Sequence, residues 1–252
     1  MPTLAGDTFV PVDHRENGVG VVDLVRQRFG VTPAFWGRYF KRPGFDEDYN
    51  PAQENAILRD NGIRLLPIAR QTARVAGTAV DGAGDAILNV DAFVGSLGVD
   101  YLAGVADELV MFLDVEGTSA QNPNLSTEYW IGWSAALVNH SRLVSGNRFT
   151  ILPAVYCRQN QSPTWNAIVQ ADSLSFPCFG AWVFRMRNNA CTRPIPDWDA
   201  PFNTPAVPLP CPVMIWQFAI DCIFDGGVDF DMINPDPAVE EALMRRLVLP
   251  PA

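Results

Sequence analysis

Lysine and histidine are scarce in this sequence, and their scarcity narrows the range of partners. Lys41 is the only lysine among 252 residues, two residues are histidine, and the other cations are scattered arginines. The formal net charge at pH 7 is -10, and no run of basic residues offsets it. A nucleic-acid backbone or an anionic membrane surface binds to concentrated positive charge. The composition therefore predicts no nucleic-acid partner.

Long apolar runs are also missing. No stretch reaches the roughly 20 consecutive apolar residues that a membrane-spanning helix needs. The segment 1–7 has neither the basic region nor the apolar region of a secretory signal peptide. We therefore expect no membrane span and no signal peptide. Any export would then have to use a non-classical route.

Metal-binding patterns of cysteine are absent as well. None of the five cysteines belongs to a Cys-x-x-Cys pair, and only His14 and His140 could complete a mixed site, so we expect no structural zinc. Cys191 and Cys211 flank a proline-rich segment and could form a disulfide, although small buried thiols are an equally good interpretation. We expect neither a metal nor a cofactor.

The most informative segment that the sequence does contain is a buried strand ending in two acids. Residues 109–113 are five consecutive apolar side chains without a helical period, which is typical of a strand buried on both faces. Asp114 and Glu116 follow, and Gly117 breaks the strand. Because alternate residues of a strand point to the same face, both carboxylates should project together from its C-terminal end. Two buried acids side by side are costly unless they are paired or used.

The rest of the chain alternates between strand-like and helix-like segments. Strands are predicted at 8–13, 34–40, 63–69, 109–113, 149–156, 179–184, 213–218 and 228–230. Helices are predicted at 18–29, 50–61, 126–143, 162–169 and 238–247, with one or two more in 79–108 that carry Asp81, Asp85 and Asp91 on outer faces. The proline-rich segment 187–212 is expected to be a long loop between the sixth and seventh strands.

This order of elements predicts an α/β fold. We expect residues 1–252 to form a single TIM-like (β/α)8 barrel domain, with a parallel sheet closed on itself. A doubly wound open sheet is the alternative. It is disfavoured because no Gly-x-Gly-x-x-Gly turn follows the first strand.

Four acids are predicted to meet at one end of the barrel. Asp13, Asp114, Glu116 and Asp229 each lie at or just past the end of a predicted strand, and the C-terminal strand ends of a parallel barrel surround its active site. Carboxylates crowded into one pocket cannot all stay ionised at neutral pH, so at least one pKa should be raised. A protonated acid beside an ionised one is what hydrolysis of a glycosidic bond requires.

Aromatic residues near the same rim suit the faces of sugar rings. The candidates for such contacts are Tyr39, Tyr156, Trp182 and Trp216. Plainer alternatives stay open for both sets of residues. The two tryptophans and Tyr156 stand in apolar runs typical of a core, and paired acids at strand ends also bind Mg²⁺ or Ca²⁺. Asp13 could accept hydrogen bonds from its own loop, and Asp229 could cap a turn.

Several of these segments together resemble glycoside hydrolase family 25, the lysozyme-type muramidases. Phe-Leu-Asp-Val-Glu at 112–116 resembles the Asp-x-Glu of the family's fourth strand. Ala-Val-Tyr at 154–156 and Ala-Trp-Val at 181–183 resemble two later strands, and Ile-Trp-Gln-Phe at 215–218 with Gly-Val-Asp-Phe at 227–230 resembles the closing pair. The resemblance implies a barrel and hydrolysis of a β-1,4-linked amino-sugar polymer such as peptidoglycan.

The first half of the chain is similar instead to the related mycobacterial-type glycoside-hydrolase-like domain of unknown function. Gly-Arg-Tyr-Phe at 37–40, the helix that ends at Gly62, and Ile-Arg-Leu-Leu-Pro-Ile at 63–68 follow the pattern of that domain. The two resemblances together cover about residues 13–234.

The resemblance to family 25 also implies roles for the acids. Glu116 matches the proton donor, and Asp114 matches the carboxylate that supports the oxocarbenium-like transition state or positions the substrate. Asp13 and Asp229 match flanking acids, although Asp-His-Arg-Glu at 13–16 departs from the family's Asp-Val-Ser. The third strand departs as well, because Arg70 stands where the family has a Tyr-His-Tyr pattern. Arg70 is expected beside the acids, where it would contact substrate and lower the pKa of neighbouring carboxyls.

The leading hypothesis is therefore a glycoside hydrolase of the muramidase type with a polysaccharide as its partner. The alternative is a non-catalytic carbohydrate-binding or structural barrel of a phage tail, an injection apparatus or an envelope complex. The altered third strand and the missing signal peptide favour that alternative. A metal-dependent phosphohydrolase is the third hypothesis, and it requires a metal in the pocket.

Overall fold

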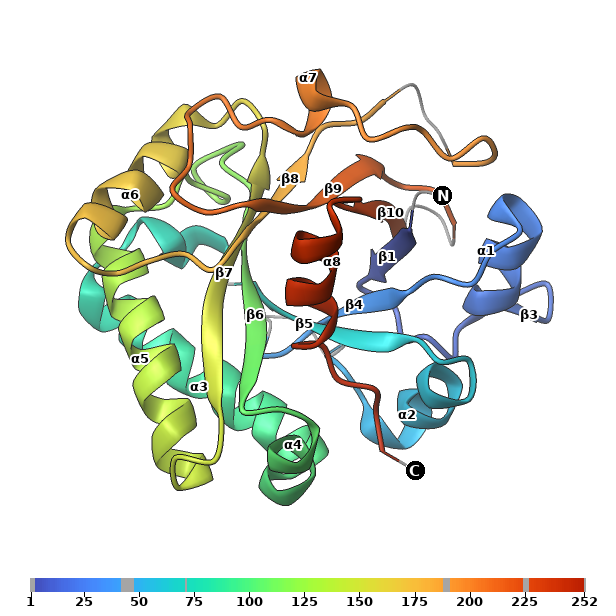
Figure 1. Cartoon of the computed structure of the whole chain (residues 1–252), viewed down its shortest axis with the longest axis horizontal. Helices are drawn as coiled ribbons and strands as arrows, with labels where there is room; N and C mark the ends of the chain where they lie inside the picture. Colours follow the sequence, from blue (N-terminus) through green and yellow to red (C-terminus); the bar gives the residue numbers. More distant parts are fainter. Residues whose placement is uncertain (1–2, 42–47, 71, 188–190, 224–226, 252) are drawn as a thin grey trace.

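Eight strands close into a barrel in the computed structural model, which describes residues 3–41, 48–70, 72–187, 191–223 and 227–251 (Figure 1). Neighbours around the ring follow the order β1-β10-β9-β8-β7-β6-β5-β4. The barrel strands are β1 (Leu4–Thr8), β4 (Phe35–Tyr39), β5 (Arg64–Arg70), β6 (Glu108–Val115), β7 (Thr150–Arg158), β8 (Ala181–Phe184), β9 (Val213–Ala219) and β10 (Val228–Ile233). The predicted α/β barrel is confirmed.

The last strand of the barrel departs from the predicted parallel arrangement. β10 runs antiparallel to both β9 and β1, while β1 and β4 to β9 pair with one another in parallel. Only residues 220–227 join β9 to β10, which is shorter than the dozen or more residues of a parallel crossover. As a result, β10 begins at the end of the barrel where the parallel strands finish.

Helices surround this ring. They are α1 (Val21–Phe29), α2 (Pro51–Asp60), α3 (Ala79–Leu97), α4 (Val99–Val105), α5 (Thr127–Ser145), α6 (Ser162–Ser173), α7 (Ala200–Asn203) and α8 (Pro237–Met244), with a 3₁₀ turn at Thr72–Ala76 and a small hairpin of β2 (Arg15–Glu16) and β3 (Val19–Gly20). Within the part of the chain that the structure describes, no single helix is both long enough and apolar enough to span a membrane.

Several helix starts follow from capping residues, as predicted. The Asn50 side chain accepts a hydrogen bond from the Ala52 amide, and Pro51 occupies the first helical position of α2. The Ser126 side chain accepts one from the Tyr129 amide at the start of α5. These local signals need no tertiary context, which is why the sequence alone located them.

The first strand lies earlier than predicted. β1 spans Leu4–Thr8, and the predicted strand 8–13 is instead a turn in which the His14 amide donates to the carbonyl of Pro11. Pro11 has no amide to donate to a strand neighbour, so it is a poor interior strand residue. Asp13 therefore does not stand at a strand end.

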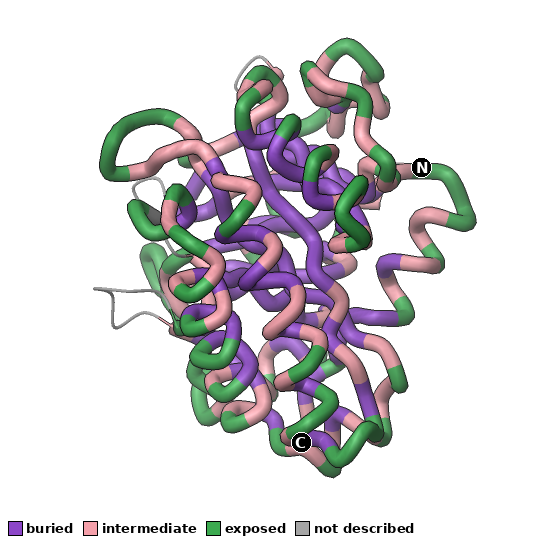
Figure 2. The backbone as a smooth tube through the Cα atoms, turned by 90° about the vertical axis from the view of Figure 1, so that its left-hand side faces the viewer, coloured by how far each residue is buried: buried purple, intermediate pink, exposed green. Residues whose placement is uncertain are grey.

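Two hydrophobic cores stabilise the barrel. The inner core fills the ring with side chains such as Phe35, Val110, Phe112 and Ile233. Leu243 near the end of α8 and Leu247 after it join this core. The outer core lies between the strands and the helices around them. Figure 2 shows the buried residues concentrated along the central strands and the exposed residues along outer turns and loops.

Helix α8 covers the end of the barrel where the parallel strands begin. Val248, just after α8, pairs with Leu65 near the start of β5, and Arg64 donates to the carbonyl of Leu247 at 2.9 Å. Arg246 also forms an ion pair with Glu108 at the start of β6. This cover leaves the opposite end of the ring available for a site.

Helices α3 and α5 pack closely against each other at two glycines, Gly82 of α3 and Gly132 of α5. A Cβ added to Gly82 would lie 2.2 Å from the carbonyl oxygen of Tyr129, and one added to Gly132 would lie 1.9 Å from that of Ala79. Polar side chains also cross this contact, since Tyr129 donates to Asp85 at 2.8 Å. The prediction that Asp85 lies on an outer face is therefore wrong, because α3 turns this side towards α5.

We expect Gly82→Ala to lower the free energy of unfolding by about 1–3 kcal/mol, the usual cost of overpacking. Gly84 is the matched control on the same helix, because a Cβ there meets nothing within 4 Å. Gly84→Ala should be neutral or stabilise by up to about 1 kcal/mol through helix propensity. Urea unfolding of both variants checks this, and equal midpoints would contradict the close approach of the helices.

The disulfide links Cys191 to Cys222, with their Cα atoms 5.3 Å apart, and Cys211 is a free thiol. The proposed bridge between Cys191 and Cys211 is therefore wrong. Cys211 lies just before β9 and Cys222 just after it, so the length of a strand separates them. Cys191 follows β8 on the side of the barrel where β9 ends, which brings it to Cys222.

Candidate active site

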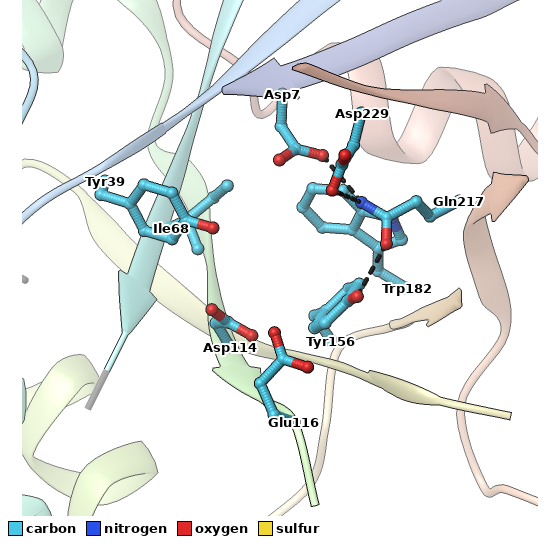
Figure 3. A pocket seen from close by; sticks show the side chains of 9 residues that line it. All are labelled: Asp7, Tyr39, Ile68, Asp114, Glu116, Tyr156, Trp182, Gln217 and Asp229. Carbon is cyan, nitrogen blue, oxygen red and sulfur yellow. Dashed lines mark hydrogen bonds between the residues drawn. The ribbon is translucent and has the colours of Figure 1, made fainter. Parts of the chain in front are cut away.

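All eight barrel strands contribute to one hollow at the end of the barrel where the parallel strands finish. Its empty volume is about 280 Å³. The lining side chains are Asp7 of β1, Tyr39 of β4, Ile68 of β5, Asp114 at the end of β6, Glu116 just after it, Tyr156 of β7, Trp182 of β8, Gln217 of β9 and Asp229 of β10 (Figure 3).

Asp114 and Glu116 occupy one side of the hollow and point into it (Figure 3). Their side chains are 4% and 23% exposed, so Glu116 is the more accessible of the two. Arg70 at the end of β5 lies beside both: its Nε is 3.2 Å from Asp114 Oδ2, and its Nη2 is 3.8 Å from Glu116 Oε1. Arg158 Nε lies 3.7 Å from the other oxygen of Glu116. Two arginines therefore offset part of the negative charge here.

Asp7 and Asp229 occupy the opposite side, facing each other across the β1–β10 pair. Gln217 joins them, because its Nε2 donates to Asp7 Oδ2 at 3.1 Å and to Asp229 Oδ2 at 3.2 Å. Asp231 is buried beneath and accepts a hydrogen bond from Trp182 Nε1 at 2.9 Å. Three carboxyls thus crowd together, and no arginine forms a salt bridge with them within the described residues.

The crowding changes the protonation of these groups. Burial, followed by the charge of Asp7, raises the pKa of Asp229 to about 9. Burial and the charge of Asp231 raise the pKa of Asp7 well above its ordinary value, and burial and Asp229 do the same to the pKa of Asp231. This side of the hollow therefore holds protons at neutral pH, as the sequence argument predicted for at least one acid.

Stability should consequently fall as the pH rises from about 5 to 9. An unfolded aspartate releases its proton near pH 4, whereas Asp229 keeps its proton in the folded chain up to about pH 9. In this window the folded chain binds more protons than the unfolded chain, so each increase in pH favours unfolding. We expect Asp229→Asn to flatten the plot of melting temperature against pH. The control Asp100→Asn, whose side chain is 94% exposed, should keep the full slope; equal slopes in both variants would contradict the burial argument.

Aromatic side chains form the walls. The Tyr156 hydroxyl donates to Gln217 Oε1 at 2.7 Å, which fixes the orientation of the amide. Its ring meets Trp182 edge to face, with centroids 5.1 Å apart. Burial, the largest cause, raises the pKa of Tyr39 and of Tyr156 well above the ordinary value. Both phenols are therefore neutral, and the single hydroxyl hydrogen of Tyr156 is already donated to Gln217.

A buried ion pair supports the strand that carries Asp7. Arg38 of β4 binds Glu54 of α2 through two contacts of 2.7 and 3.0 Å, and both side chains are 0% exposed. Arg38 also donates to the carbonyl of Thr8 at 2.8 Å, and Glu54 accepts from the Val12 amide at 3.0 Å. The pair thus fixes β1 and the following turn against β4 and α2.

Most of the predicted site residues meet in the hollow. Asp114, Glu116, Asp229, Tyr39, Tyr156 and Trp182 line it, and Arg70 contacts two of its acids. Asp13 and Trp216 do not line it. Trp216 precedes Gln217, and neighbouring strand residues point to opposite faces, so Trp216 packs in the outer core against Phe202 and Phe218.

Sequence reasoning missed Asp7, Gln217 and Asp231. Asp7 ends a short apolar segment in the same way as Asp114, and this was the available signal. The contact with Gly37, where an added Cβ would lie 2.6 Å from the Cβ of Asp7, is visible only in the structure. Within the described ranges, no three His, Cys, Asp or Glu side chains are arranged to hold a metal ion.

No protein-family model matches the sequence, and no curated protein matches it either. Solved structures do. An uncharacterized B. stearothermophilus protein is 18% identical with a TM-score of 0.68, over 97% of this chain and 99% of that one. The catalytic domain of endolysin ply40 from Listeria monocytogenes bacteriophage P40 is 14% identical with a TM-score of 0.56, over 98% of each chain. A muramidase from Acremonium alcalophilum is 14% identical with a TM-score of 0.54, over 96% and 98%. At these identities the chain shares the barrel fold of all three.

Proposed function

We propose that this protein is a muramidase-type glycoside hydrolase that cleaves a β-1,4-linked amino-sugar polymer such as peptidoglycan. The observation that carries the proposal is one hollow with acids on two opposing sides and aromatic walls between them. Hydrolysis of a glycosidic bond uses one acid to protonate the leaving oxygen and a second carboxylate to stabilise or attack the anomeric carbon.

In this proposal Glu116 is the proton donor, because it is the more exposed acid of its pair and two arginines reach it only at 3.7–3.8 Å. Asp114, with Arg70 at 3.2 Å, is the ionised partner that stabilises positive charge at the anomeric carbon. Asp7, and not Asp13, is the acid that flanks the catalytic pair together with Asp229. Asp229, protonated at neutral pH, donates a hydrogen bond to the sugar.

The walls would hold the substrate. Trp182 and Tyr156 offer ring faces and edges, and the neutral phenols of Tyr39 and Tyr156 add polar wall without negative charge. The Asp-x-Glu resemblance to glycoside hydrolase family 25 and the shared fold with an endolysin catalytic domain and a muramidase support this substrate class.

The test is the release of new reducing ends from purified peptidoglycan, measured beside chitin as a second β-1,4-linked amino-sugar polymer. We expect release from peptidoglycan and a loss of turbidity of the cell-wall suspension. A protein that is folded by circular dichroism yet releases no reducing ends from either polymer between pH 4 and 9 would contradict the proposal.

A non-catalytic glycan-binding barrel is the second candidate. The observation that favours it is the approach of Arg70 and Arg158 to Glu116, since two guanidinium groups at 3.7–3.8 Å give this carboxylate a role in ion pairs that needs no catalysis. Sedimentation of the intact protein with insoluble peptidoglycan, without any release of reducing ends, would support this candidate.

A further inference from the structure

A second hollow adjoins the acidic one on the same rim of the barrel, and we call it the arginine hollow. Its empty volume is about 820 Å³. The residues that form it include Arg158, Gln159, Phe184, Arg185, Met186 and Ile220, which end or follow β7, β8 and β9. It carries two cations, and none of its lining residues is acidic, although the whole chain has a net charge of -10.

Arg158 stands between the arginine hollow and the proposed catalytic acid. It lines the arginine hollow and also lies 3.7 Å from Glu116, which lines the acidic hollow. A polymer seated on Glu116 can therefore extend one of its substituents into the arginine hollow.

Both guanidinium groups are positioned by aromatic rings. Arg158 lies over Phe184 with 4.8 Å from its Cζ to the ring centroid, and Arg185 lies over Phe202 at 4.7 Å. Arg185 Nη1 donates to Gln159 Oε1 at 2.6 Å and to the carbonyl of Pro201 at 3.1 Å. Stacking and hydrogen bonds of this kind hold a long side chain in one orientation before a ligand arrives.

The groups retain donors for a ligand. Arg158 Nε is buried and faces Glu116 Oε2 at 3.7 Å, so a ligand in the arginine hollow meets the exposed remainder of this guanidinium, whose side chain is 37% exposed. Within the described residues, Arg185 uses only Nη1 of its three nitrogens. A planar guanidinium presents parallel donors that match a carboxylate.

We propose that the arginine hollow binds a carboxylate carried by a substituent of the glycan chain that occupies the acidic hollow. The inference rests on the proposed function in taking that chain to be a cell-wall amino-sugar polymer. In peptidoglycan, the carboxylate belongs to the lactyl group where muramic acid carries no peptide, and to the peptide where one is attached through that group. Neutral polymers such as chitin offer no such group.

The test uses the Glu116→Gln protein, which prevents turnover, and compares its binding to three insoluble polymers by sedimentation. They are peptidoglycan freed of teichoic acid, the same material with its carboxylates capped as ethanolamides, and chitin. We expect capping to weaken binding about tenfold or more, the range for charge-assisted hydrogen bonds. Adding Arg158→Gln and Arg185→Gln, singly and together, should abolish the preference for uncapped polymer.

Arg148→Gln is the matched control, because Arg148 lies just before β7 at the other end of the barrel and pairs with Asp100. It should keep the full preference. N-acetylmuramic acid and muramyl dipeptide are then compared as competitors for binding to the uncapped polymer. The first carries a lactyl carboxylate and the second a peptide carboxylate, so the stronger competitor identifies the group that is bound. Equal binding of the Glu116→Gln protein to capped and uncapped polymer would overturn the inference, as would a preference that survives loss of both arginines.

The two proposals fail separately. If the wild-type protein prefers uncapped polymer but releases no reducing ends, the carboxylate site is supported and the hydrolytic function is refuted. If it cleaves peptidoglycan without any preference for uncapped polymer, the hydrolytic function is supported and the carboxylate site is refuted.

Discussion

Glu116→Gln is expected to reduce the release of reducing ends from peptidoglycan by about 10²–10⁴-fold, the usual contribution of general acid catalysis. Glutamine has nearly the shape of glutamate but cannot give up a proton to the leaving oxygen. Glu116 is 23% exposed at the edge of the hollow, so the substitution should leave the inner core intact. The melting temperature should therefore change little while the rate falls.

Glu108→Gln is the matched control for this variant. Glu108 is the first residue of β6, and Glu116 follows the last residue of the same strand. Glu108 pairs with Arg246 at the end of the barrel that α8 covers. Glu108→Gln makes the same substitution at the opposite end of β6, away from the acidic hollow. It should retain the wild-type rate. Full activity in Glu116→Gln would remove Glu116 from the mechanism and turn attention to Asp229, the acid with a pKa of about 9.

Glu54→Gln is expected to cause the largest loss of stability, about 3–5 kcal/mol, because it leaves the charge of Arg38 buried without its partner. Both side chains are 0% exposed. For a chain of this size the melting temperature should fall by about ten degrees. The glutamine also keeps only one acceptor oxygen for the donors that Glu54 now satisfies, which include the amides of Val12 and Asn50.

The double variant Arg38→Met/Glu54→Leu separates the charge from the packing. Removing both partners leaves no uncompensated charge, so its loss of stability should be smaller than that of Glu54→Gln alone. Glu128→Gln, at an exposed position of α5, should leave the melting temperature unchanged. A Glu54→Gln protein as stable as this control would refute the structural role given to the pair.

Local patterns predicted what depends on neighbours in the sequence. The run at 109–113 became β6, and the caps at Asn50 and Ser126 became the starts of α2 and α5. Asp114 and Glu116 point to one side because strand geometry alone requires it. The barrel followed from the alternation of such elements.

Features that depend on closure of the ring could not be derived in this way. The inward face of β9 is chosen by its place in the barrel, so Gln217 lines the hollow while Trp216 packs outside it. The direction of β10 depends on a short connection, and the partner of Cys191 depends on which end of β9 lies beside it. Asp7 became a site residue only because β1 stands between β10 and β4.

The pairing of β1 with β10 also determines when the acidic hollow forms during synthesis of the chain. Asp7 belongs to the first barrel strand along the chain and Asp229 to the last, yet they face each other across a single strand pair. A growing chain therefore has no complete hollow until its final barrel strand has emerged and closed the ring. Under the proposed function, a chain that terminates before β10 lacks Asp229 and a closed ring, so it would be inert towards the cell that made it.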